Sequence, residues 1–181
     1  MRYFGLILTI MAFVFSIYKF RKSDKEQMLG LGKIDKSRPP KMRIVYSRKQ
    51  LPKNRQKVVN SRDANDVFRK IWSKQLDIRE EMYVLFLNRK NMVLGYHILS
   101  MGGITGTIAD RRLLFAVALN SLATSIIIAH NHPSGQLKPS IEDVELTKII
   151  SETGKIMNIK LLDHLIIGRN AFYSFADEGE L

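Results

Sequence analysis

Two histidines lie one residue apart in the segment AHNHPSGQLKPSIED, directly after the aliphatic run SIII. In an extended chain, residues i and i+2 project to the same side, so His130 and His132 present both imidazoles on one face of a strand end. Strand ends that open onto loops are where α/β proteins commonly build their sites. Two imidazoles in this position make the strand end a candidate metal site.

A metal ion needs further ligands, and the 181-residue chain contains no cysteine. A carboxylate is therefore the expected third ligand. If Ser140 caps the helix that follows the loop, Asp143 lies in its first turn and its side chain leans back toward the loop. Two histidines and one aspartate leave a fourth zinc position open for water, which is typical of catalytic sites. The segment thus predicts one Zn²⁺ per chain, held by His130, His132 and Asp143.

The same residues also fit a simpler interpretation. A Ser-x-x-Asp sequence at a helix start is a variant of the capping box, which satisfies free backbone N–H groups without a metal. The residues Pro133-Ser134-Gly135 would then form an ordinary turn. The joint occurrence of all these features at a strand end favours the metal site over a helix cap alone.

A hydrolytic metal site also needs a general base. The segment REEMYVLFLN offers Glu80 and Glu81 at the start of a strand, where alternation assigns them to opposite faces. Both faces of this strand are apolar, so periodicity does not choose between the two glutamates. A second interpretation is that both are solvated residues ahead of the strand.

Helices and strands interleave along the second part of the chain, which predicts an α/β fold with a mixed sheet. The strand SIIIAH lacks alternation and is expected to be fully buried. Within the apolar strand that follows, His164 is expected to be a core histidine that Asp163 could orient. We expect helices near 60–76 (capped by Ser61), 110–123 (capped by Asp110) and 140–157, and strands near 82–88, 92–100, 125–130, 159–168 and 171–175, with a hairpin turn at 88–91.

Basic charge is concentrated in the first part of the chain. Residues 1–79 contain 20 Lys and Arg against 6 Asp and Glu, whereas residues 80–181 contain 9 against 11. Residues 21–57 are polar, basic and interrupted by prolines, so we expect a linker there. A basic linker either attracts nucleic acid or anionic lipid, or is only solvated.

The chain begins with an apolar segment, residues 3–18, that carries no charge. As a helix it would extend about 24 Å, slightly less than the hydrocarbon layer of about 30 Å. Basic residues are more frequent after it than before it, which would keep the following domain in the cytoplasm. We therefore expect residues 1–20 to form an apolar helix that anchors a cytoplasmic protein to the membrane, with a buried or accessory helix as the alternative.

A glutamate followed by HNHPSG and PSIED resembles the JAMM motif of the JAB/MPN metallopeptidase superfamily. The sequence AHNHPSG, together with LLDHLIIG and YSFADEG, is similar to that of the RadC branch, whose members have long been described as DNA repair proteins. The resemblance runs from about Val59 to Leu181, and residues 58–181 are expected to form the domain. It implies a JAB fold related to the cytidine deaminases, with zinc held by His130, His132 and Asp143.

The resemblance also implies a role for each residue of the site. The family's glutamate stands eight residues before the residue that ends the FLN strand, which selects Glu80 over Glu81. Glu80 would deprotonate a zinc-bound water and later protonate the leaving amine, while Ser140 would hydrogen-bond the developing oxyanion. The expected function is a zinc-dependent metallopeptidase or isopeptidase that acts on a peptide or protein substrate.

The alternative function is a nucleic-acid-associated module, for DNA repair or a mobile element, in which the JAB domain is a scaffold. The helix-hairpin-helix region of longer RadC proteins is not evident here, and residues 21–57 would make the phosphate contacts. A zinc deaminase is disfavoured, because it would require His-x-Glu and Cys-x-x-Cys. The sequence does not indicate an oligomeric state.

Overall fold

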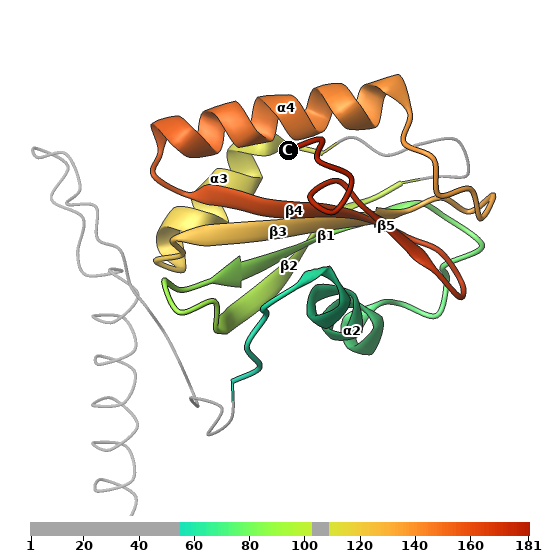
Figure 1. Cartoon of the computed structure of the whole chain (residues 1–181), viewed down its shortest axis with the longest axis horizontal. Helices are drawn as coiled ribbons and strands as arrows, with labels where there is room; N and C mark the ends of the chain where they lie inside the picture. The colour runs from blue at the N-terminus through green and yellow to red at the C-terminus, as the bar shows by residue number, and fades with distance from the viewer. Residues whose placement is uncertain (1–54, 103–108) are drawn as a thin grey trace, which may run out of the picture. The chain divides into compact units, whose positions relative to one another are not determined.

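The computed structural model describes residues 55–102 and 109–181. They form a five-stranded mixed sheet with helices on both faces (Figure 1). The strand order is β2-β1-β3-β4-β5, with β3 and β4 parallel and the other neighbours antiparallel. The predicted α/β class is confirmed. The elements are α2 (Ser61–Ile71), β1 (Glu81–Leu87), β2 (Val93–Met101), α3 (Arg111–Asn120), β3 (Ser125–Asn131), α4 (Ile141–Ile156), β4 (Lys160–Ile167) and β5 (Phe172–Ser174).

The central strands β1 and β3 are buried on both faces. Their even-numbered residues, such as Val84 and Ile128, belong to the core beneath α3 and α4. Their odd-numbered residues, such as Leu85 and Ala129, pack with residues of α2 on the opposite face (Figure 1). A strand covered on both sides has no polar face, which explains the absence of alternation in SIIIAH.

The helix starts are fixed by side-chain caps. As predicted, Asp110 caps α3 and Ser140 caps α4. The predicted cap of α2 is wrong by one residue: Asn60 accepts a hydrogen bond from the Asp63 N–H, and Ser61 is the first helical residue. Asparagine and serine are equally good caps, so the adjacent pair in the sequence does not distinguish the two positions.

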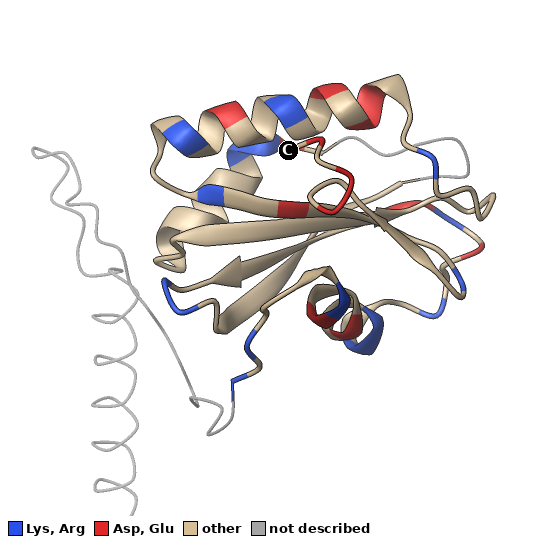
Figure 2. Cartoon of the chain, in the orientation of Figure 1, with Lys and Arg blue, Asp and Glu red and all other residues tan. Residues whose placement is uncertain are grey.

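The charges along α4 follow the helix dipole. Glu142 and Asp143 lie in the first turn and Lys155 lies in the last turn, so acidic residues are at the positive end and a basic residue is at the negative end. Figure 2 shows this arrangement along the helix. The acidic end of α4 is the end that carries the predicted aspartate ligand.

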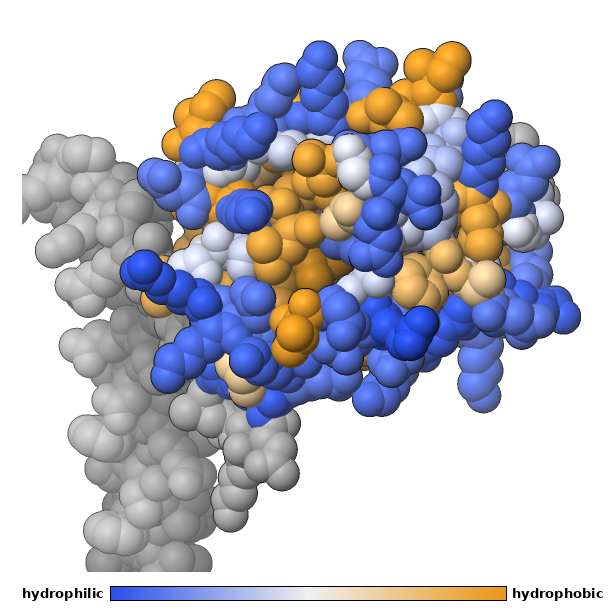
Figure 3. All heavy atoms as spheres, viewed as in Figure 1, coloured by the Kyte–Doolittle hydropathy of each residue, from blue (hydrophilic) through white to orange (hydrophobic). Residues whose placement is uncertain are grey.

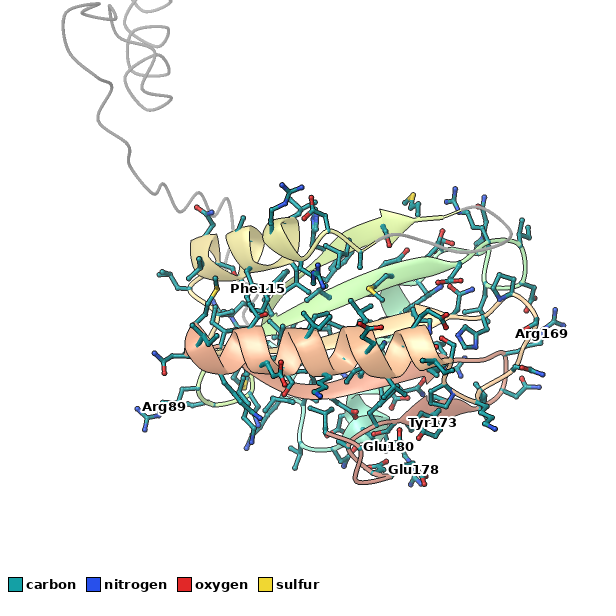
Figure 4. All side chains as sticks on the ribbon, turned by 90° about the horizontal axis from the view of Figure 1, so that it is seen from above. Arg89, Phe115, Arg169, Tyr173, Glu178 and Glu180 are labelled. Atoms are coloured by element: carbon teal, nitrogen blue, oxygen red, sulfur yellow. The ribbon has the colours of Figure 1, made fainter. Side chains whose placement is uncertain are left out.

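The predicted hairpin between β1 and β2 is confirmed. Asn88 accepts hydrogen bonds from the N–H groups of Lys90 and Met92, and Asn91 has a left-handed backbone with φ 56°. This turn lies at the opposite end of the sheet from the β4–β5 turn, as the labelled residues Arg89 and Arg169 show in Figure 4.

The expected apolar helix (1–20) and nearly all of the expected basic linker (21–57) lie outside the described residues, and their boundaries stay predictions. The last linker residues are described, and the Gln56 carbonyl accepts a hydrogen bond from the Val93 N–H. In the part of the chain that the structure describes, no helix combines the length and apolar character needed to cross a membrane.

Candidate metal centre

Three side chains converge where the end of β3 meets the start of α4. The Nε2 atom of His130 lies 2.9 Å from Nε2 of His132 and 3.1 Å from Oδ1 of Asp143. The Nε2 atom of His132 lies 3.4 Å from Oδ2 of Asp143. Tetrahedral zinc ligands at about 2.0–2.1 Å from the ion lie about 3.3 Å from one another. The three groups therefore have the spacing that a single small ion requires.

The hydrogen bonds around His132 determine which of its ring nitrogens faces the other ligands. Its Nδ1 lies 2.9 Å from the carbonyl oxygen of Gln136. A carbonyl only accepts hydrogen bonds, so Nδ1 carries the proton in the neutral ring. The Nε2 lone pair of His132 is then directed at His130 and Asp143.

A chain of hydrogen bonds fixes His130 in the same way. The Thr147 hydroxyl donates to the backbone carbonyl of Asp143, so its oxygen must accept from Nδ1 of His164, 2.6 Å away. The Nε2 atom of His164 then accepts from Nδ1 of His130, at 2.8 Å. This order leaves the Nε2 lone pair of His130 directed at His132. The two imidazoles and the carboxylate therefore meet as three acceptors, a donor set that suits a metal cation.

The structure shows the predicted capping box and also brings its aspartate to the two histidines. Ser140 and Asp143 form a capping box, in which Oδ2 of Asp143 accepts from the Ser140 N–H (2.8 Å) and the Ser140 hydroxyl (2.7 Å). The same carboxylate contacts His130 and His132. The cap therefore orients the candidate ligand and does not compete with it.

The Asp143 carboxylate is electrostatically tied to the histidines. In the metal-free protein a proton can take the place of the ion, and a protonated histidine then donates to Asp143. Burial by itself would raise the pKa of Asp143, but these hydrogen bonds with His130 and His132 outweigh that effect and hold the pKa well below its usual range. The hydrogen bond with Asp143 in turn raises the pKa of His132 above its usual value. A proton and a metal ion therefore compete for the same nitrogen.

The two adjacent glutamates lie in different surroundings. Glu81 is fully buried on the α2 face, where its carboxylate pairs with Arg79 (2.8 Å) and accepts a hydrogen bond from Tyr83 (3.2 Å). Glu80 is half-buried and close enough to the histidines for their charges to act on it. The predicted assignment to opposite faces is confirmed, and the interpretation of both as solvated residues is wrong.

The environment of Glu80 shifts its proton affinity. Burial raises the pKa of Glu80, the charges of His130 and His132 lower it, and the charge of Asp143 raises it, with a net increase. The charges of all three acceptor groups thus act on Glu80, and a raised pKa is the condition of many general bases.

His164 is the residue whose importance sequence reasoning underestimated. It is a fully buried core histidine, as predicted, and burial lowers its pKa well below the usual value. The predicted orienting role of Asp163 is wrong, because that carboxylate accepts from the backbone N–H groups of His164 and Ala176 and from the Ser174 hydroxyl. The ring is held by Thr147, which stands one helical turn after Asp143 and for that reason could have been proposed as a partner.

A cavity of about 610 Å³ lies away from this centre, at the other end of α4. Lys155 of α4 and Lys160 of β4 are among its lining residues, and Figure 3 shows a hollowed hydrophobic area below α4 on this face. None of the three acceptor groups lines the cavity. The cavity is therefore separate from the candidate metal centre.

A mixed sheet whose buried strand ends in His-x-His, facing an aspartate on the next helix, defines a JAB-type domain. Residues 58–180 match the family model of the RadC-like JAB domain, and the chain belongs to this family.

Similar proteins include UPF0758 proteins from several bacteria. The protein from Flavobacterium johnsoniae is 47% identical over 123 residues, which cover 68% of this chain and 53% of that protein. The protein from Porphyromonas gingivalis is 46% identical over 104 residues, which cover 57% and 46% of the two chains. This chain thus spans about half the length of the curated relatives it matches, and their names state no activity.

Proposed function

We propose that this protein is a zinc-dependent hydrolase that cleaves peptide or isopeptide bonds. The observation that carries the proposal is the meeting of three acceptor atoms, from His130, His132 and Asp143, beside Glu80. Acceptors held at these distances repel one another unless a cation or a proton lies between them. The hydrogen bonds that both Nδ1 atoms donate favour the metal, because they leave both Nε2 lone pairs directed inward.

His130, His132 and Asp143 would hold the ion and leave part of its coordination free. Zinc bound by three protein ligands supplies a nucleophilic hydroxide near neutral pH and a Lewis acid for a carbonyl group. The side chain of His132 is 18% exposed, whereas that of His130 is 1% exposed. A substrate would therefore approach from the side of His132.

Glu80 would act as the general base and then as the general acid. Its carboxylate would accept the proton of the attacking water and later donate that proton to the nitrogen of the leaving amine. A raised pKa suits both steps, because the group must hold the proton between them. Amide hydrolysis requires such a donor, since an unprotonated amine anion is a poor leaving group.

Ser140 would support the site through Asp143. Its hydroxyl and its N–H both bind the same carboxylate oxygen, which fixes the direction of the ligand. The role in oxyanion binding that the resemblance implies would require the hydroxyl to leave Asp143. Orientation of Asp143 is therefore the role that its contacts favour.

The test combines metal analysis with a cleavage screen on the full chain. We expect about one equivalent of zinc in the wild-type protein and the loss of zinc and of cleavage in His132→Ala. His97→Ala is the matched control, because His97 is a half-buried histidine of β2 outside the three-residue cluster. The screen uses peptide libraries and isopeptide-linked substrates. The proposal would be contradicted if the wild-type protein took up no zinc, or if the His132→Ala variant retained zinc.

Nucleic-acid binding is a second candidate function, favoured by the basic excess in residues 21–57. Phosphate contacts by Lys and Arg make binding strongly salt-dependent. We expect deletion of residues 1–57 to weaken DNA binding and to flatten its salt dependence. An unchanged affinity after the deletion would exclude the basic segment as the contact.

A further inference from the structure

The side chain of Asn131 continues the pairing of β1 with β3 beyond the end of the backbone ladder. The last backbone pair is Met82 with His130. One residue further, Oδ1 of Asn131 accepts from the Glu81 N–H at 2.9 Å, and Nδ2 donates to the Arg79 carbonyl at 2.9 Å. A carboxamide offers a donor and an acceptor as a peptide group does. The Asn131 side chain therefore takes the place of a strand partner.

These hydrogen bonds hold the backbone immediately before and after Glu80. The residues immediately before and after it are bound to the same carboxamide, and Nδ2 also donates to the Leu76 carbonyl at 2.6 Å. On the side of β2, the carbonyl of Glu80 itself accepts from the Gly102 N–H at 2.8 Å. The backbone around Glu80 is thus held on one side by the Asn131 side chain and on the other by the residue that follows β2, although Glu80 lies outside β1.

Asn131 is also the residue between the two candidate histidine ligands. The imidazoles of His130 and His132 face α4, and alternation along β3 directs the Asn131 side chain to the α2 face. The residue is 0% exposed, so water does not compete for its carboxamide. The same short segment that presents the ligands therefore also fixes the start of β1.

We infer that Asn131 is a positioning residue that sets the place of Glu80 relative to His130 and His132. The catalytic part of this inference rests on the proposed function. The amide is required at this position because an aspartate would direct a carboxylate oxygen at the carbonyls of Leu76 and Arg79, with no donor between them. A change at Asn131 should therefore displace the general base and leave the metal ligands in place.

The test compares Asn131→Ala and Asn131→Asp with the control Asn88→Ala. Asn88 also binds backbone groups at an end of β1, at the hairpin far from the centre, so its removal costs similar local hydrogen bonds. We expect all three variants to retain about one equivalent of zinc. The kcat of both Asn131 variants should fall by about 10- to 100-fold, as expected for a displaced catalytic group, whereas Asn88→Ala should stay within about two-fold of wild type.

Two further measurements separate positioning from general destabilisation. The double variant Glu80→Gln/Asn131→Ala should be no slower than Glu80→Gln alone, because residues that act as a unit are not additive. Hydrogen exchange at the Glu81 amide should accelerate in Asn131→Ala, since that amide donates to the missing side chain. The exchange measurement does not depend on any activity.

The outcomes distinguish failure of this inference from failure of the proposed function. Wild-type kcat in Asn131→Ala, or an additive further loss in the double variant, would overturn the positioning role. Wild-type protein that binds zinc but cleaves nothing would overturn the proposed function, and exchange at Glu81 would then decide whether Asn131 holds this segment. If Asn131→Ala does not fold, Asn131→Asp provides the kinetic comparison, because it retains the acceptor for the Glu81 N–H and loses only the donor to the Leu76 and Arg79 carbonyls.

Discussion

The two faces of the sheet surround adjacent glutamates in different ways. On the α2 face, Glu81 is fully buried and compensated by Arg79 and Tyr83. On the α4 face, Glu80 is half-buried next to His130 and His132, and its burial raises its pKa. A carboxylate compensated by fixed partners stabilises structure, whereas one with a raised pKa at an open site can exchange protons. Two residues of the same type thus have different surroundings because they face different layers.

Replacement of Glu80 by glutamine is expected to have the largest effect on activity. We expect Glu80→Gln to lower kcat by about 10²- to 10⁴-fold, since an amide cannot take up the proton of the attacking water. Zinc content should stay at the wild-type level, because Glu80 is outside the three-residue cluster. Steady-state kinetics with a substrate from the cleavage screen measure the effect. Equal activity of Glu80→Gln and the wild type would refute its role as base.

The pH dependence of zinc binding tests the electrostatics of the α4 face. The bond with Asp143 raises the pKa of His132 above 6.5, so the metal-free ring becomes protonated as the pH falls through that raised value. Below it, zinc must displace a proton, and the affinity should fall by about tenfold per pH unit for each proton released. Competition titrations from pH 8 to pH 5.5 measure this. A constant affinity over the whole range would contradict it.

On the α2 face the expected effect of mutation is on stability. Glu81→Gln removes the charge that pairs with Arg79 and should lower the free energy of unfolding by about 1–3 kcal/mol. Urea denaturation measures this loss, while kcat should change by less than about threefold. A loss of activity as large as that of Glu80→Gln, without loss of stability, would reverse the assigned roles.

The smallest effect is expected for the helix cap. Ser140→Ala should lower the free energy of unfolding by about 1 kcal/mol through loss of the cap. It should also weaken zinc binding by about tenfold, because Ser140 orients Asp143. Asn60→Ala removes the cap of α2 on the other face and is the matched control, with a similar loss of stability and unchanged zinc affinity. Equal zinc affinity in the wild type, Ser140→Ala and Asn60→Ala would show that the capping box has no role in metal binding.

Much of the candidate site could be predicted because it depends on local geometry. His130 and His132 share a face in any extended strand, and Ser140 and Asp143 are three residues apart at a helix start. The assignment of Glu80 and Glu81 to opposite faces follows from alternation alone. The cap of α2 was misplaced because Asn60 and Ser61 are both good caps, and only the backbone of Asn60 distinguishes them.

Contacts between distant residues could not be predicted in the same way. The hydrogen bond between His130 and His164 depends on the parallel register of β3 and β4, which pairs Ile128 with His164. The contacts of Asn131 with Arg79 and Glu81 depend on the antiparallel pairing of β1 with β3. Neither register can be predicted from periodicity, because these strands are apolar on both faces.

By itself, the sequence determined the order of helices and strands, the shared face of the two histidines and the capped aspartate, because these follow from periodicity and short-range hydrogen bonds. Periodicity left open which face of β1 meets α4, and only the resemblance selected Glu80; the tertiary structure shows that the charges of the histidines act on Glu80 while Glu81 is buried with Arg79. The physical reason is that both faces of the strand are equally apolar. Either orientation of β1 would bury its apolar side chains, and the packing of the helices on the two faces selects one.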